Sequence, residues 1–180
     1  ARGFSTQPAV AFRFSHQLDY DTLKFGGDDA TFIFVDVTPG DDALGRRPRS
    51  RFFATTDRSR YVCHNWLGIR PSEGSPLEPG HTYAVFFRAG LTDEDGTPLE
   101  PDADFASVMQ ITPPAHPALE NAWRQYQPFR AWLATEGIPL DEVVGGTVFT
   151  VDDPHRFTNG LRAAVHAAPA PVLEAQVLCD

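Results

Sequence analysis

Strand-length stretches with alternating apolar residues recur along this sequence and constrain its fold more than any other feature. The clearest covers residues 81–88, where Tyr83, Val85 and Phe87 fall on one face. An apolar residue at every second position is typical of a half-buried strand. Further strands are expected at 9–15, 31–37, 51–54, 60–64, 66–70, 104–111 and 147–151, with Gly, Pro and Asp turns between them. We therefore predict a mainly β fold, an antiparallel β-sandwich.

Helical spacing replaces the alternation after Pro113-Pro114. Between residues 117 and 136 the apolar residues lie three and four apart, and Pro128 should divide this segment into two short helices. A last helix is expected at 154–167, with Asp153 as its N-cap. We accordingly divide the chain into a sandwich at 1–112 and a helical connector at 113–180, which adds one returning strand and a C-terminal tail.

The charge and hydropathy of the chain limit the kinds of partner that it could bind. The formal net charge is −9, which disfavours nucleic acid because its phosphates would be repelled. No apolar run approaches the roughly 18–20 residues that cross a bilayer, so no transmembrane segment is expected. The chain begins at Ala1 without a signal peptide, as a mature, trimmed or excised segment would.

Two stretches resemble bacterial immunoglobulin-like domains of the S-layer type. Residues 14–23 (FSHQLDYDTL) are similar to the family's opening motif, F-S-x-x-L-D-x-x-T-L. Residues 76–85 (PLEPGHTYAV) and 90–99 (GLTDEDGTPL) are similar to its P-L-x-P-G-T-x-Y-x-V and G-L-x-D-x-x-G-x-P-L motifs. The resemblance implies an immunoglobulin-like β-sandwich over about residues 9–112, followed by the helical extension. It specifies turns and strands and implies no chemistry.

A second resemblance concerns the rest of the chain. Trp132-Leu133, Gly137-Ile138-Pro139 and Val148-Phe149-Thr150 are similar to the region after the immunoglobulin-like module in large secreted bacterial lipases. In those proteins the region leads toward an α/β-hydrolase domain. This implies a bacterial protein that is secreted or displayed on the cell surface, and a parent protein that could be a hydrolase.

No arrangement for catalysis is recognisable. The sequence has no G-x-S-x-G, and Ser75 lies in a Gly-Ser-Pro turn. Cys63 and His64 are neighbours, and neighbouring side chains on a strand point to opposite faces, which argues against a nucleophile–base pair. We therefore predict no catalytic residues, no cofactor and no enzyme activity within this chain.

The two cysteines, Cys63 and Cys179, are compatible with one disulfide or with two free thiols. In an oxidising compartment the disulfide would join the C-terminal tail to the sandwich. Closing so long a loop would stabilise the fold by about 4 kcal/mol in the chain-entropy model.

Metal sites are not indicated, apart from a weak calcium candidate at Asp93 and Asp95. An EF-hand loop starting at Asp93 would need glycine at its sixth position, where Pro98 stands. A looser calcium site or a solvated hairpin turn remain the alternatives. The six histidines show no H-x-x-x-H or H-E-x-x-H spacing, so no transition-metal site is expected.

One basic cluster, formed by Arg46, Arg47, Arg49 and Arg51, is a candidate binding surface. Its guanidinium groups could bind a sulfated or phosphorylated glycan or anionic lipid headgroups, or the loop is simply solvated. Trp66, Trp123 and Trp132 could form an aromatic platform for a sugar if they are exposed, although Trp123 and Trp132 also fit the helical core pattern.

These observations lead to one functional prediction with two alternatives. The first is a non-catalytic accessory module, which positions a downstream or separate domain of the same protein outside the cell. The second is a module that binds a glycan or cell-wall polymer. The third is the N-terminal fragment of a secreted lipase or esterase.

Overall fold

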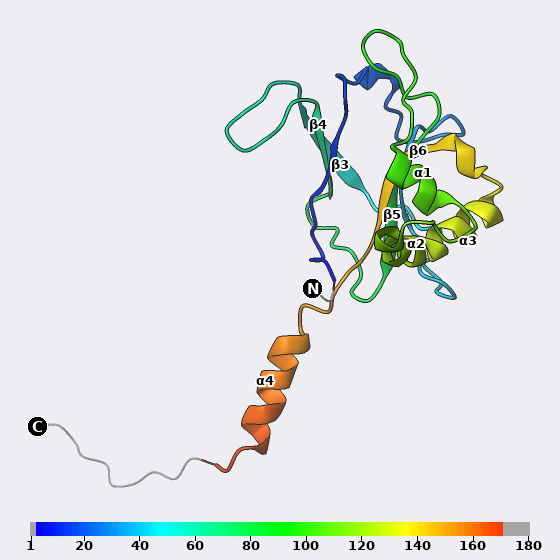
Figure 1. The fold of residues 1–180 in the computed structure, drawn as a ribbon. Coiled ribbons are helices and arrows are strands. Elements are labelled where there is room, and N and C mark those ends of the chain that lie inside the picture. The colour runs from blue at the N-terminus through cyan, green and yellow to red at the C-terminus, as the bar shows by residue number, and fades with distance from the viewer. Residues whose placement is uncertain (1–2, 171–180) are drawn as a thin grey trace, which may run out of the picture.

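The computed structural model describes residues 3–170, and within them six strands form two antiparallel sheets (Figure 1). The first sheet has the order β1-β4-β3 and comprises Val10–Arg13, Trp66–Pro71 and Ser50–Thr55. The second has the order β2-β5-β6 and comprises Phe32–Asp36, Thr82–Arg88 and Val143–Thr150. Each sheet is three strands wide, and all strand pairs are antiparallel.

Four α-helices and three short 3-10 turns complete the described chain. The helices are α1 (Ala103–Met109), α2 (Glu120–Gln125), α3 (Gln127–Glu136) and α4 (Arg156–Ala167). The 3-10 turns are η1 (Tyr20–Thr22), η2 (Pro117–Leu119) and η3 (Leu140–Glu142). Helices α1 to α3 lie together beside the second sheet, whereas α4 stands away from the body (Figure 1). Among the described residues, no helix has the length and apolar character needed to cross a membrane.

The first hydrophobic core lies between the two sheets. Phe34 of β2 and Val85 and Phe87 of β5 face Leu67 and Ile69 of β4, and all five are buried. This is the face that the alternation in residues 81–88 predicted, because side chains two apart on a strand share a face.

The second core lies on the opposite face of β2-β5-β6. Val35 and Phe86 point away from the first core and pack against Phe129, Trp132 and Leu133 of α3. Every residue of β2 is therefore buried, since sheet and helices cover its two faces. The result is three layers, in which one sheet is shared by two cores.

The prediction of a mainly β, immunoglobulin-like sandwich is wrong. The protein is mixed α/β, with 26% helix and 25% strand. The physical reason is that the second sheet presents apolar residues on both faces, so helices must cover the face that the first sheet leaves open. Strand β6 pairs with β5 from Val143 to Thr150, so residues on both sides of position 112 build this sheet.

Two predicted strands are also absent from the structure. Residues 103–109 form α1 instead, where Asp102 caps the helix by accepting a hydrogen bond from the Asp104 amide at 2.9 Å. Phe105, Val108 and Met109 have helical three- and four-residue spacing, which the alternation assigned to this segment obscured. Residues 60–64 lie in the loop between β3 and β4.

The N-terminal segment joins the end of the second sheet. The Phe4 amide donates to the Thr150 carbonyl at 2.9 Å, and the Asp152 amide donates to the Phe4 carbonyl at 2.8 Å. The ring of Phe4 meets that of Phe149 edge to face, with 5.4 Å between centroids. Residues before β1 therefore extend the β6 edge before the chain crosses to the first sheet.

Candidate functional site

The outer face of the first sheet is open to solvent and carries an aromatic pair. Phe53 of β3 and Trp66 of β4 point away from the core, and their rings lie 4.9 Å apart between centroids. The side chain of Phe53 is 42% exposed. We name this pair, together with Gly68, the aromatic platform.

Gly68 determines how the platform lies. It stands directly opposite Phe53 in the β3–β4 register. A Cβ atom built on Gly68 would come within 2.3 Å of the Phe53 Cζ atom, so the ring covers the space that a side chain would take. An aromatic ring that packs over a cross-strand glycine is held against the sheet by that contact.

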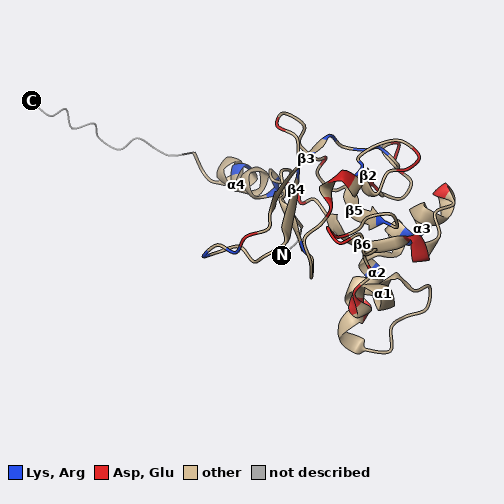
Figure 2. Cartoon of the chain, turned by 90° about the horizontal axis from the view of Figure 1, so that it is seen from above, with Lys and Arg blue, Asp and Glu red and all other residues tan. Residues whose placement is uncertain are grey.

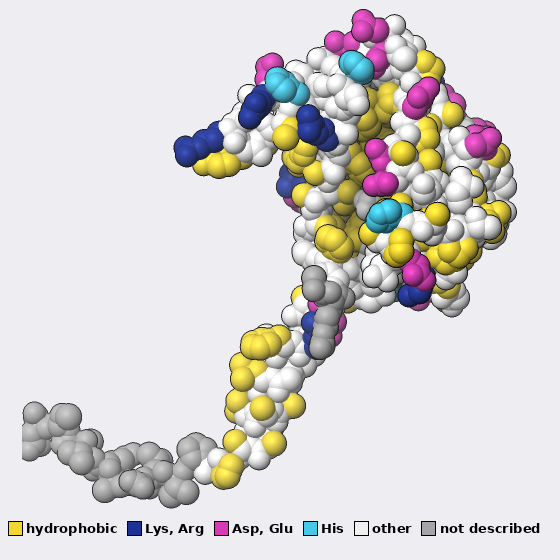
Figure 3. All heavy atoms as spheres, in the orientation of Figure 1, with side chains coloured by type: hydrophobic (Ala, Val, Ile, Leu, Met, Phe, Trp, Pro, Cys, Tyr) yellow, Lys and Arg dark blue, Asp and Glu magenta, His cyan; other side chains and the backbone are white. Residues whose placement is uncertain are grey.

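Three arginines flank the aromatic platform. Arg13 of β1 lies opposite Trp66 in the register, and Arg51 of β3 lies opposite Arg70 of β4. All three follow the same outward alternation as Phe53 and Trp66, and all three are exposed. Basic side chains gather on this side of the molecule (Figure 3), while most acidic side chains lie over the second sheet and the helices (Figure 2).

Glu73 holds two of these arginines in place. Its carboxylate meets Arg51 Nε at 3.2 Å and an Arg70 guanidinium nitrogen at 2.7 Å. A hydrogen bond from its own backbone, followed by the charges of the two arginines, lowers the pKa of Glu73. The glutamate stays ionised and orients the two guanidinium groups. Three cations against one anion leave this face positive on a chain of net charge −9.

The predicted arginine cluster is divided by the fold. Arg51 belongs to the outer face, and Arg49 is exposed just before β3 on the same side by strand alternation. Arg46 instead pairs with Glu78 at 2.6 Å, and Arg47 is exposed in the loop between β2 and β3. Arg46 and Arg51 are therefore paired with different glutamates, Glu78 and Glu73.

Sequence reasoning missed Arg13, Arg70 and Phe53 as members of one surface. Strand alternation alone predicts that Arg13 shares a face with Ala11 and that Arg70 shares a face with Gly68. The sequence alone does not reveal the sheet order β1-β4-β3, which brings these three separate segments side by side.

The calcium candidates have a structural role in a turn. One oxygen of Asp93 accepts hydrogen bonds from the amides of Asp95, at 3.1 Å, and Thr97, at 2.8 Å. The side chain of Asp95 is exposed. Across residues 3–170 no group of three or more histidine, cysteine, aspartate or glutamate side chains is arranged to hold a metal ion. The turn itself accounts for Asp93.

Cys63 lies exposed in the β3–β4 loop. Cys179 falls outside the described residues, so their disulfide stays a prediction. The neighbouring His64 directs its Nδ1 atom to the Thr56 carbonyl at 3.1 Å, which fixes the ring against the loop backbone.

A second charged cluster surrounds His81, which directly precedes β5. The His81 Nδ1 atom lies 2.7 Å from the buried carboxylate of Asp36, while Nε2 faces Glu78 at 3.4 Å and Asp41 at 3.8 Å. Burial lowers the pKa of His81, but the hydrogen bond to Asp36 and the three negative charges outweigh it, so the pKa is raised overall. Burial also raises the pKa of Tyr83 to about 12, which keeps its hydroxyl protonated beside the Glu78 amide.

This cluster predicts a pH-dependent stability. Unfolded histidine titrates near pH 6.5, and the folded pKa of His81 is higher. Its stabilising charge interactions are fully present below about pH 6.5 and are lost as the pH rises through the raised folded value. We expect the free energy of unfolding, measured by urea denaturation across this window, to fall with rising pH. His81→Asn should flatten that part of the profile, and an unchanged slope would contradict the assignment.

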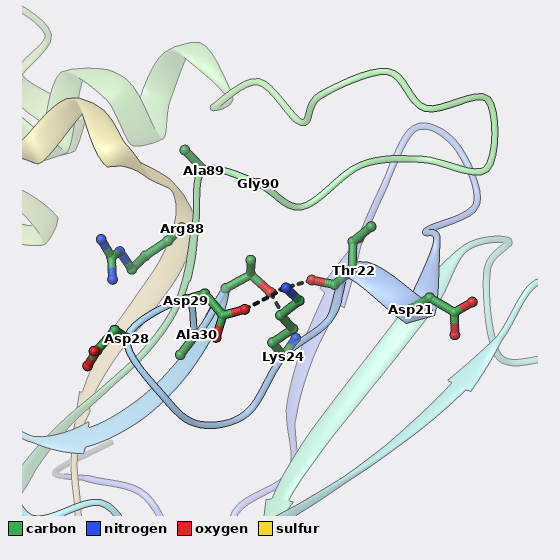
Figure 4. Close-up of a pocket in the computed structure, with 10 residues that line it drawn as sticks. Asp21, Thr22, Lys24, Asp28, Asp29, Ala30, Arg88, Ala89 and Gly90 are labelled. Atoms are coloured by element: carbon green, nitrogen blue, oxygen red, sulfur yellow. Dashed lines mark hydrogen bonds and ion pairs between the residues drawn. The ribbon is translucent and has the colours of Figure 1, made fainter.

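A pocket of about 310 Å³ near η1 holds charged side chains that already have partners (Figure 4). Lys24 Nζ lies 2.6 Å from Asp29, and Arg88 pairs with Glu142. Because these cations are neutralised by neighbouring carboxylates, the pocket offers less to an anionic ligand than the outer face of the first sheet does.

The fold and this face together define a mixed α/β protein with an exposed, positively charged aromatic surface. No protein-family model matches the chain, and no curated protein matches it in sequence. The resemblance to S-layer-type domains therefore has no family match to support it.

Proposed function

We propose that this chain is a non-catalytic binding module that holds an anionic polysaccharide on the outer face of β1-β4-β3. The observation that carries the proposal is the aromatic platform flanked by Arg13, Arg51 and Arg70. Such a ligand also fits an extracellular or cell-surface setting, which remains part of the proposal.

The aromatic platform and the arginines each match one part of an anionic sugar. A sugar ring has an apolar C–H face that packs on an exposed aromatic ring, which supplies contact area at little entropic cost. Guanidinium groups bind carboxylate and sulfate through paired hydrogen bonds, and those held in place lose less entropy on binding. Glu73 supplies that preorganisation for Arg51 and Arg70.

The test uses the full chain and heparin oligosaccharides as the probe. Changing Arg13, Arg51 and Arg70 to serine should raise the dissociation constant by about tenfold for each residue, as measured by calorimetry. The control replaces Arg46 and Arg47, two arginines of the β2–β3 loop outside the three strands of the first sheet, and should bind almost normally. A neutral glucan of similar length should bind far more weakly than heparin.

Two results would overturn the proposal. The first is the same loss per arginine removed in the control and in the triple variant, since binding would then follow total charge. The second is tighter binding to single-stranded DNA than to heparin at the same salt concentration, because the surface would then serve a nucleic acid.

A further inference from the structure

Helix α4 exposes an apolar stripe that no described part of the chain covers. Phe157, Leu161 and Val165 lie four residues apart and are 80%, 56% and 65% exposed. Residues at this spacing share one face of a helix. Since large apolar stripes on the surface mark interaction sites, α4 calls for a partner surface.

The charged residues of α4 are basic. Arg156 and Arg162 flank the stripe on either side by helical rotation, and His166 follows near the C-terminal end. The helix contains no aspartate or glutamate between residues 156 and 167. A surface that receives this helix should therefore combine an apolar floor with an acidic rim.

The body of the same protein has such a surface. A groove of about 700 Å³ runs between β1 and β6, and its floor is lined by Phe12, Phe14, Phe87, Leu99, Phe105 and Val144. All but Phe87 are only half-buried, because the groove leaves them open on one side. Apolar side chains are visible along a hollow between the two sheets in Figure 3.

The walls of this groove carry more acidic than basic side chains. Asp93, Glu100 and Asp102 line it together with Arg13 and His16, and His16 lies 4.0 Å from Asp93. Asp93 and Asp102 already accept backbone hydrogen bonds, whereas the exposed Glu100 makes no ion pair or hydrogen bond with a described residue. Glu100 is therefore the acid most available to an arriving arginine.

The connection to β6 directs α4 away from its own groove. Arg156 pairs with Asp152 at 2.9 Å, and one oxygen of Asp153 accepts a hydrogen bond from the His155 amide at 2.8 Å. The groove is lined at Val144, Gly145 and Gly146, near the start of β6, whereas the helix leaves from its far end (Figure 1).

We propose that α4 docks in the β1–β6 groove of a second copy of this chain, so that two copies exchange helices. The groove receives the stripe formed by Phe157, Leu161 and Val165, and Glu100 in its wall meets Arg162. An exchanged element of this kind closes a two-fold dimer with two equivalent contacts. The proposal does not depend on the polysaccharide site, although Arg13 borders both that surface and the groove.

Sedimentation of the full chain over a wide range of protein concentration tests this. We expect a reversible dimer that Leu161→Ser weakens by about tenfold or more, because the central anchor of the stripe is lost. Ala163→Ser, on the polar side of the same helix, is the matched control and should leave the dimer intact.

Exchanging the charges of Glu100 and Arg162 tests whether α4 binds in the groove. Glu100→Lys and Arg162→Glu should each weaken the dimer, and the double variant should recover part of the loss, since the pair is restored with reversed signs. A synthetic peptide of residues 153–168 should compete with the dimer and shift the full chain toward monomer.

Each other outcome overturns the proposal. A monomer at every concentration excludes exchange, and a monomer that cosediments with phosphatidylglycerol vesicles identifies α4 as a membrane-surface helix instead. A dimer that is lost in Leu161→Ser but unaffected by both charge variants and by the peptide places the contact between two helices, outside the groove.

Discussion

Replacing Phe129 with alanine is expected to lower the free energy of unfolding by about 3–5 kcal/mol. The side chain is fully buried between α3 and the second sheet, and its ring lies 4.8 Å from that of Phe86 between centroids. Its removal leaves a cavity that the β5 backbone cannot collapse to fill, because the first core holds the other face of the same strand.

Urea denaturation monitored by two probes tests whether the helices and the sheets unfold together. Tryptophan fluorescence and the far-ultraviolet signal should shift together to lower urea concentration in Phe129→Ala. Ile111→Ala is the control, because it also removes apolar atoms but from a residue that is 79% exposed; its effect should stay within about 0.5 kcal/mol. Separate transitions for sheet and helices would contradict the three-layer arrangement.

Gly68→Ala should abolish most polysaccharide binding while the fold survives. The new Cβ would stand 2.3 Å from the Phe53 ring, so the ring must leave the sheet. The atoms that move are the far end of an exposed side chain, so the loss of stability should be small. The dissociation constant for heparin oligosaccharides should rise by roughly tenfold or more, since the Phe53 ring no longer lies beside Trp66.

Gly146→Ala provides the matched glycine substitution. Its Cβ would lie 2.7 Å from the Phe86 Cβ and 2.9 Å from the Val85 carbonyl oxygen, and neither can move without shifting β5. We expect a loss of about 1–3 kcal/mol in the free energy of unfolding, with binding per folded molecule unchanged. If both variants lost stability equally and bound equally well, the aromatic platform would not be the site.

The strands at β1, β2, β4 and β5 could be predicted because alternation and turn residues agree there. Their assembly could not be predicted, since alternation fixes which residues share a face and says nothing of which strands are neighbours. The stretch TFIFVDV illustrates this: its unbroken burial in β2 requires a helical layer that lies a hundred residues later in the chain.

The candidate site was predicted only in part, for the same reason. Trp66 was recognised as a potential sugar platform and Arg51 as a potential anion ligand, both on chemical grounds. Their partners Phe53, Gly68 and Arg70 become evident only through the β3–β4 register. Local clustering of arginines in the sequence suggested a surface that contains Arg46, which instead pairs with Glu78.

The hydrogen bonds between Phe4 and the end of β6 have a geometric consequence for larger assemblies. They place Phe4, where the chain joins the folded body, directly beside Val151, where the chain leaves it. Domains attached at these two points would therefore lie close together. A pulling force applied between the two points would act on these hydrogen bonds before it reached either sheet.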